Sequence, residues 1–359
     1  MLASASPLVS VVIPSYNHRK FIGEAIESVL RSTVQDLEIV VVDDGSVDDS
    51  AEVVGRFTDE RIRLFRQPNR GAHAAINRGV ASASAPWVAV LNSDDRFHPS
   101  KLQQHLELHK ERPDLEASAS RVRYISESGA ALARDRYVNW RYDQLKDIHR
   151  RIPSLKSSLL VANHLITTSA LFVSKQVFLE SGGMIPLRYV HDWFCFLTLA
   201  GRGHFAVLDH ELVDYRVHGR NTIRENDAMG CVEENFLLEW HLSRTCEETS
   251  QAIEVVDLLN TLKQNRRVSL RLILLFQLWR TANDSDLAKC AAIFEDPAHP
   301  VIDAALKLLH EDYRGLRVKA RTRKVLGEHL WSILADQKAR GARIAANCLA
   351  LLGWSKTRP

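Results

Sequence analysis

The chain is poor in cysteine and in long apolar runs, and each shortage excludes a class of protein. Its 359 residues include five cysteines, which lie far apart and form no C-x-x-C pair. Such spacing argues against a disulfide framework or a zinc cluster and indicates a reducing compartment. A membrane-spanning helix needs roughly 18 apolar residues, and the nearest candidate, "VSLRLILLFQLW", is shorter and contains Arg271. Neither a secreted disulfide scaffold nor an integral membrane protein is expected.

The N-terminus lacks the features of a signal peptide. No basic region precedes the apolar run of "MLASASPLVSVVIP", and that run ends at Pro14. We therefore expect a cytoplasmic location. Peripheral contact with the inner face of the plasma membrane is a further hypothesis.

The net charge is only +3, which gives no indication of a nucleic-acid binder. The charge is unevenly distributed, because residues 314–359 carry 11 basic and 2 acidic side chains. This basic tail predicts a negatively charged partner, and an anionic membrane surface is one candidate. The C-terminal region also has two apolar stripes flanked by basic residues, "RVSLRLILLFQLWR" and "ARIAANCLALLGW". Such helices either lie on a membrane surface or pack against the rest of the chain or a second subunit.

The first hundred residues alternate between two hydrophobic patterns. Near-continuous runs of β-branched and apolar residues predict strands buried on both faces at 8–14 and 37–44, and two further strands are predicted at 61–67 and 87–92. Amphipathic periodicity predicts helices at 20–33, 46–57, 71–83 and 99–111. This alternation is typical of an α/β fold with a mainly parallel sheet flanked by helices.

The next hundred residues are less regular. A hairpin is predicted from 115–126 and 131–137, and the polar, basic segment 138–156 is interpreted as a loop. Further along, the patterns predict a strand and short helix at 165–184, a helix at 191–203 that opens with Asp192, and a pair of strands at 204–219. From about Arg220 onward the pattern is helical, so we place a domain boundary near residue 225, dividing 1–225 from a helical 226–359.

Polar residues follow each of the first four predicted strands. The segments are "PSYN", "DDGS", "QPNRG" and "NSDD". Within the last, the adjacent carboxylates of Asp94 and Asp95 repel each other unless water, a cation or a ligand compensates them. A solvated turn that caps the next helix is the alternative. Because ligands of parallel α/β sheets bind at the carboxyl ends of the strands, four polar strand ends favour a pocket.

Six blocks together resemble glycosyltransferase family 2, whose members are inverting enzymes of the GT-A fold that use nucleotide-sugar donors. The blocks occur in the family's order and approximate spacing: "VSVVIPSYNHRKFIGEAIESVL", "LEIVVVDDGSVDDS", "NRGAHAAINRGV", "LNSDDRFHPSKL", "HDWFCFLTLA" and "YRVHGRNT". The resemblance covers residues 8 to 225. It implies a catalytic domain whose nucleotide-sugar half is 8–112 and whose acceptor and base half is 113–225.

The resemblance implies a donor site. An aromatic ring at Tyr16 can pack on a base, and Asp44 can accept from the imide N–H of uracil, which favours a UDP-sugar; a capped turn is the alternative for both. The donor-binding residues expected are Pro14, Tyr16, Asp44, Asn77, Asn92, Asp94 and Arg216. The family often has Asp where this chain has Asn92, a neutral oxygen donor.

The resemblance also implies a cofactor, Mn²⁺ or Mg²⁺, held against the donor diphosphate. Hard cations of this kind prefer oxygen ligands, and imidazole suits Mn²⁺ as a borderline ligand. The metal ligands expected are Asp94, Asp95 and His218. A hydrogen-bonded histidine in a loop is the alternative for His218.

Asp192 is the expected catalytic base, because inverting transfer needs one group to take the proton of the acceptor hydroxyl. A helix N-terminus keeps a carboxylate ionised, although an N-cap Asp is the alternative. The family usually has Glu where this chain has His191, and His191 and Trp193 are weaker expectations for acceptor binding; Trp193 also suits the core.

The sequence therefore predicts a metal-dependent, inverting glycosyltransferase. The expected acceptor is a growing bacterial glycan, such as a polysaccharide or O-antigen, lipid-linked or attached to protein. One alternative is a non-catalytic nucleotide-sugar-binding scaffold on the same fold. A nucleotidyltransferase would need a glycine-rich basic loop after the first strand, and "PSYNHRK" has no glycine.

Overall fold

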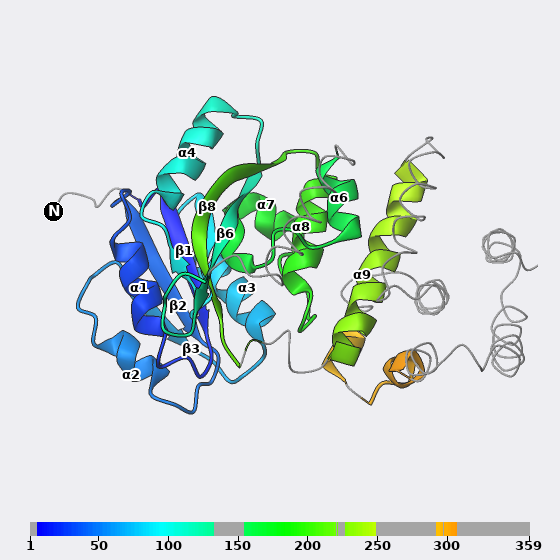
Figure 1. The fold of residues 1–359 in the computed structure, drawn as a ribbon, viewed down its shortest axis with the longest axis horizontal. Helices are drawn as coiled ribbons and strands as arrows, with labels where there is room; N and C mark the ends of the chain where they lie inside the picture. The colour runs from blue at the N-terminus through cyan, green and yellow to red at the C-terminus, as the bar shows by residue number, and fades with distance from the viewer. Residues whose placement is uncertain are drawn as a thin grey trace, which may run out of the picture.

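The computed structural model describes residues 6–132, 154–219, 221, 227–248, 292–296 and 298–306. Within these residues one sheet has the strand order β3-β2-β1-β4-β7-β6-β8-β5 (Figure 1). The four strands predicted from the first hundred residues are confirmed and pair in parallel: β1 (Val9–Ser15), β2 (Leu37–Asp43), β3 (Ile62–Arg66) and β4 (Trp87–Val90).

The other half of the sheet is mixed. Strand β7 (Leu171–Ser174) runs antiparallel to both β4 and β6 (Ala117–Ser126). Strand β8 (Phe205–Val217) is parallel to β6, and the short β5 (Arg96–Phe97) is antiparallel to β8. The parallel half therefore ends at β4, where the two adjacent carboxylates follow.

The prediction of two strands at 204–219 was wrong. Strand β8 continues through the segment, and its register against β6 shifts between Ser120 and Arg121, whose partners are Leu208 and Glu211. A β-bulge thus takes Asp209 and His210 out of the regular pairing. The polar residues Asp209 and His210, between the two predicted strands, form an irregularity within one strand.

Helices cover both faces of the sheet (Figure 1). One face carries α1 (Ile22–Leu30), α2 (Ser50–Gly55) and α4 (Lys101–Glu111). The other carries α3 (Ala72–Ser82), α6 (Leu155–Val161), α7 (Lys175–Glu180), α8 (His191–Gly201) and α9 (Asp227–Glu248). This arrangement divides the core into two layers.

The alternation of side chains along the parallel strands supplies both layers. On β1, Val11 and Ile13 pack with the α1 layer, whereas Val12 packs with the α3 layer. Because successive side chains of a strand point to opposite faces, a strand buried on both faces must be apolar at nearly every position. This is why β1 and β2 read as continuous apolar runs.

The structure tests only part of the two predictions for residues 131–156. Of the predicted hairpin, one bridge between Ile125 and Ala131 is present, and residues 133–137 lie outside the described residues. The loop interpretation of 138–156 was wrong at its end, because α6 begins at Leu155. The Ser154 side chain accepts from the backbone N–H of Ser157, which is an ordinary N-cap.

The predicted helical character of the C-terminal region is confirmed for α9, and residues 249–291 and 307–359 lie outside the described residues. Its buried side chains, including Phe236 and Trp240, belong to the same core layer as α8. The basic tail, 314–359, and the apolar stripe at 267–280 lie outside the described residues. In the described part of the chain no helix is both long enough and apolar enough to cross a bilayer.

Helix α3 lies unusually close to β1 at Gly79. A Cβ on this residue would clash with Cγ1 of Val12, in the core layer that the two elements share. Since core packing is dense, neither element can withdraw without opening a void. The glycine therefore sets the distance between α3 and the strand that leads into the polar loops.

We expect Gly79→Ala to lower the free energy of unfolding by about 1–2 kcal/mol, because overpacking outweighs the helix propensity gained. Gly55→Ala is the matched control: it is also helical, has no atom within 4 Å of the added methyl group, and should be neutral or stabilising. Denaturant titration measures both. A Gly79→Ala protein as stable as the wild type would contradict the close packing.

Candidate functional site

Polar side chains converge where β1, β2 and β4 end, as the sequence predicts. Asp44 follows β2 and is buried, and its carboxylate accepts from the Gln67 side chain and from the backbone N–H groups of Arg70 and Gly71, at 2.7–2.9 Å. Pro14 is buried within β1, and Tyr16, just beyond the strand, is 44% exposed. Asp44 thus fixes the β3–α3 loop beside an exposed aromatic ring.

Two buried polar atoms at the same strand ends have no hydrogen-bond partner within the described part of the chain. They are the Ser15 hydroxyl at the end of β1 and Oδ1 of Asp43 at the end of β2. Buried polar groups are almost always paired with protein, water or ligand. Their position next to Tyr16 and Asp44 indicates a site that a polar ligand or water completes.

After β4, the side chains of Asn92 and Asp95 are held by one hydroxyl-rich segment, Thr167–Ser169. The Asn92 amide donates to Thr167 and accepts from Thr168, at 2.9 and 3.1 Å. Oδ2 of Asp95 accepts from Ser169 at 2.6 Å and from Thr167 at 3.3 Å. Oδ1 of Asp95 accepts the backbone N–H of Arg216 at 3.0 Å. Both Asp95 oxygens are therefore turned to protein donors.

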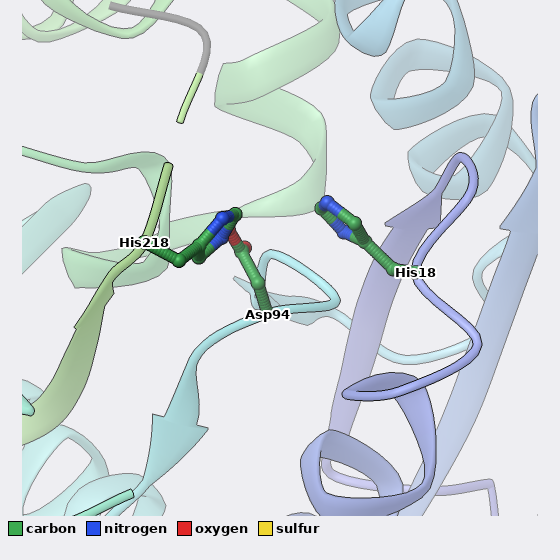
Figure 2. Close-up of side chains that lie close together, drawn as sticks. All are labelled: His18, Asp94 and His218. Carbon is green, nitrogen blue, oxygen red and sulfur yellow. The ribbon is translucent and has the colours of Figure 1, made fainter. Parts of the chain in front are cut away.

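Asp94 faces two histidines instead. Its Oδ2 lies 2.9 Å from Nε2 of His218, which follows β8, and His18 comes from the β1–α1 loop (Figure 2). One ligand atom from each of the three residues lies within 4.8 Å of the others, a spacing compatible with a metal ion. Asp94 and His218 were predicted as metal ligands; His18 was not.

The environments of the two adjacent carboxyls push their pKa values apart. Burial opposes ionisation of Asp94, but the His218 hydrogen bond and the charges of His18 and His218 outweigh it, so the pKa of Asp94 is lowered. Burial and the neighbouring charge of Asp94 raise the pKa of Asp95 well above its ordinary value, despite the bonds from Ser169, Arg216 and Thr167. Asp94 is therefore the anionic member of the pair.

Arg216, expected at the donor, is fully buried and bonded to protein acceptors. Its guanidinium donates to the backbone oxygens of Asp94 and Glu127 and to the Glu24 carboxylate, each at 2.7 Å. It also lies over the Phe21 ring, 4.9 Å from the centroid. Arg216 thus joins the β4 loop, the end of β6 and helix α1 around the site.

Asp192 lies in the first turn of α8, as predicted. Its side chain is 9% exposed, accepts from the Asn163 amide at 3.3 Å, and accepts the Trp193 backbone N–H at 2.6 Å. Burial raises the pKa of Tyr215, and the charges of Asp95, Asp94 and Asp192 raise it further. The pKa of Tyr215 therefore depends on Asp192 and on both members of the acidic pair.

The remaining predicted residues have protein partners of their own. The Asn77 amide both donates to and accepts from the backbone of Met184, at 2.7 and 2.8 Å. The Trp193 indole is buried and donates to Leu159, which fits the core alternative. Nδ1 of His191 donates to the Leu187 oxygen, and burial lowers the pKa of His191 to about 4, so the ring is neutral at pH 7.

Sequence reasoning missed His18 and Glu233. His18 lies within the quoted "PSYNHRK", but one histidine in a polar loop carries no signal of its own. Glu233 lies on α9, and its carboxylate accepts the backbone N–H groups of Arg188 and Tyr189, at 3.0 and 2.7 Å. These residues immediately precede α8, so the C-terminal region holds the segment that positions Asp192.

Glu233 also makes a pH-dependent contribution to stability. Burial raises its pKa from 4.5 to about 7, although the backbone N–H groups of residues 188–190 oppose the shift. Between these values the folded state binds the extra proton, so the contribution of Glu233 to stability is full below pH 4.5 and is lost as the pH rises through 7.

We expect Glu233→Gln to remove a stability loss of about 3 kcal/mol or less between pH 4.5 and 8. The measurement is the free energy of unfolding of wild type and variant across that range. Glu60→Gln, in the exposed loop before β3, is the control. Parallel pH profiles for wild type and Glu233→Gln would contradict the raised pKa.

Comparison with known proteins gives consistent matches. Residues 10–166 match a family model described as glycosyl transferase family 2. An uncharacterised glycosyltransferase of Rickettsia typhi is 31% identical over 236 residues, which cover 64% of this chain and 69% of that protein. Chondroitin synthase of Pasteurella multocida is 27% identical over 222 residues, but the chain spans only 22% of its length.

Two groups of solved structures show the fold. TarS of S. aureus in complex with UDP-GlcNAc has a TM-score of 0.54 at 15% identity, covering 85% of this chain and 87% of TarS. A mannosyltransferase of Pyrobaculum calidifontis, in complex with GDP-Man and Mn²⁺, has a TM-score of 0.52 at 16% identity, with 86% and 87% covered. The predicted GT-A fold is confirmed.

Proposed function

The chain belongs to glycosyltransferase family 2, and on this premise we propose that it transfers a sugar from a UDP-sugar to an acceptor hydroxyl, with inversion and with a divalent metal ion. The observation that carries the proposal is the cluster of His18, Asp94 and His218 at the end of β4, with Asp192 at the start of α8. In this proposal the cluster is the cation site and Asp192 is the carboxylate base.

The cluster fits the ion that the family implies. Two imidazoles and a carboxylate are donors for a borderline divalent cation, and Asp94 is the anionic member of its pair. When bound, the ion neutralises charge on the donor diphosphate as the glycosidic bond to it breaks. Asp95 could bind the ion only by giving up one of its hydrogen bonds from Thr167, Ser169 or Arg216. We therefore assign Asp95 to positioning of the loop.

The donor end of the site favours a nucleoside diphosphate. Asp44 accepts three hydrogen bonds from the β3–α3 loop, and a carboxylate has room for a fourth, which the imide N–H of uracil supplies. The exposed ring of Tyr16 offers a face for the base. The unpartnered Ser15 and Asp43 atoms at the same strand ends are available to the ribose or to bridging water. Asn77, Asn92 and Arg216 support these loops through their protein partners.

Asp192 takes the proton of the acceptor hydroxyl as that oxygen attacks the anomeric carbon. It lies in the first turn of α8, where the helix dipole favours negative charge. The Asn163 amide and the Trp193 N–H hold one oxygen each, which fixes the direction of the base. A single displacement with one base inverts the configuration, and no covalent intermediate forms.

For the acceptor we propose a bacterial glycan, lipid-linked or attached to protein. Chondroitin synthase and hyaluronan synthase of Pasteurella multocida are among the relatives by name. We assign the neutral His191, next to Asp192 in the chain, to contact with a sugar hydroxyl, because a neutral ring does not compete for the proton. We further propose that the basic residues of 314–359 bring the enzyme to an anionic membrane surface that carries such an acceptor.

The donor assignment predicts a metal-dependent affinity for UDP. In calorimetric titrations of UDP, GDP and dTDP, UDP should bind most tightly, and omission of Mn²⁺ or the Asp94→Asn change should weaken binding by roughly tenfold or more. Asp114→Asn, an exposed surface change, is the control and should bind as wild type. Preference for another base would overturn the uracil role of Asp44. No nucleotide binding at all would overturn the donor site itself.

The base assignment predicts that Asp192→Asn separates binding from transfer. The variant should bind UDP as wild type does, while kcat for transfer falls by roughly 10²–10⁴-fold. Transfer is measured with the donor sugar that the titrations select and an acceptor mixture from bacterial glycans. A variant that retains wild-type kcat would remove Asp192 from the reaction.

A further inference from the structure

His18, in the β1–α1 loop, is held by hydrogen bonds to its backbone and to its ring. The His18 backbone N–H donates to the Ser50 hydroxyl at 2.9 Å, and its carbonyl accepts the N–H groups of Phe21 and Ile22 at the start of α1. Its Nδ1 lies 2.8 Å from the Ser93 hydroxyl, next to Asp94. Main chain and ring are thus fixed separately.

Phe21 braces both imidazoles. Its ring centroid is 5.9 Å from that of His18, edge to face, and 5.1 Å from that of His218. Phe21 is itself 8% exposed and lies beneath the Arg216 guanidinium, so it cannot move aside without disturbing the core. Contacts within the protein therefore hold both histidine rings in fixed orientations.

We propose that His18 is a third protein ligand of the metal ion, so that the site is a preformed set of two imidazoles and one carboxylate that selects Mn²⁺ over Mg²⁺. With Nδ1 on Ser93, Nε2 is the ligand atom, and the serine supplies the outer hydrogen bond that metal-binding histidines ordinarily have. The 2.9 Å between Asp94 and His218 matches the separation of about 3 Å for adjacent ligands on one ion of this size.

The donor set explains the selectivity. Mg²⁺ prefers oxygen ligands and retains water, whereas imidazole suits borderline ions. A site with a single carboxylate and no imidazole would depend on the diphosphate to complete it. Three protein ligands bind the ion before the nucleotide. The inference rests on the proposed metal dependence of the site, which it deepens.

Electron paramagnetic resonance of Mn²⁺ with the full chain, without nucleotide, tests the proposal. The loss of the free-ion signal gives affinity, and electron spin echo modulation counts coupled imidazole nitrogens. Wild type should bind one ion with two imidazoles, and a large excess of Mg²⁺ should be needed to displace it. His18→Gln should show one imidazole and roughly tenfold or more weaker binding.

His204→Gln, an exposed histidine, is the control and should match wild type. A wild-type spectrum with one imidazole, or no bound Mn²⁺ without nucleotide, overturns the proposal even if His18→Gln fails to fold. Two bound imidazoles in a protein that binds no nucleotide would support the metal site but contradict the proposed transferase function. Metal-dependent UDP binding with one bound imidazole would support the proposed function but contradict the role of His18.

Discussion

The two adjacent carboxylates at the end of β4, with Asp95 buried and Asp94 partly exposed, are the constraint on which the site depends. Like charges at that spacing are tolerated only when they meet different surroundings. Successive residues turn Asp95 toward the Thr167–Ser169 hydroxyls and Asp94 toward His18 and His218. The Asp95 carboxyl is thereby held by protein donors, whereas the Asp94 carboxyl faces the two histidines. Such a division of environments is what assigns distinct roles to like residues in enzyme sites.

The division holds because residues distant in sequence close around β4. Arg216 links the β4 loop to β6 and α1, and its own backbone N–H holds Asp95. Its position follows from β8 lying parallel to β6, despite the bulge at 209–210. The charge of Arg216 is compensated in part by Glu24, so the guanidinium acts as a strut between loops and need not meet a phosphate to be satisfied.

The sequence predicted the parallel half of the sheet and the residues at its strand ends, because buried strands leave an unambiguous apolar pattern and their ends must meet. It predicted Asp94, His218 and Asp192 in positions where the structure can use them. It could not separate Asn77 and Arg216, bonded to protein, from side chains that face a ligand, since both kinds are polar residues near loops. Nor could it find His18, whose place beside Asp94 and His218 depends on the geometry of the β1–α1 loop and on its contact with the Phe21 ring.

The family model covers the loops around the acidic pair but not the helix that carries Asp192. The family match ends at residue 166, after the donor loops and the acidic pair but before α8. Asp192 is instead positioned by a segment whose backbone N–H groups are held by Glu233 of α9, beyond the boundary expected near 225. Hydrophobic periodicity detects the helix but not an inward carboxylate. Because α9 shares the core layer of α8, this helix helps to fix the position of α8, which carries Asp192 in its first turn. The boundary expected near 225 therefore divides two helices that pack in one core layer.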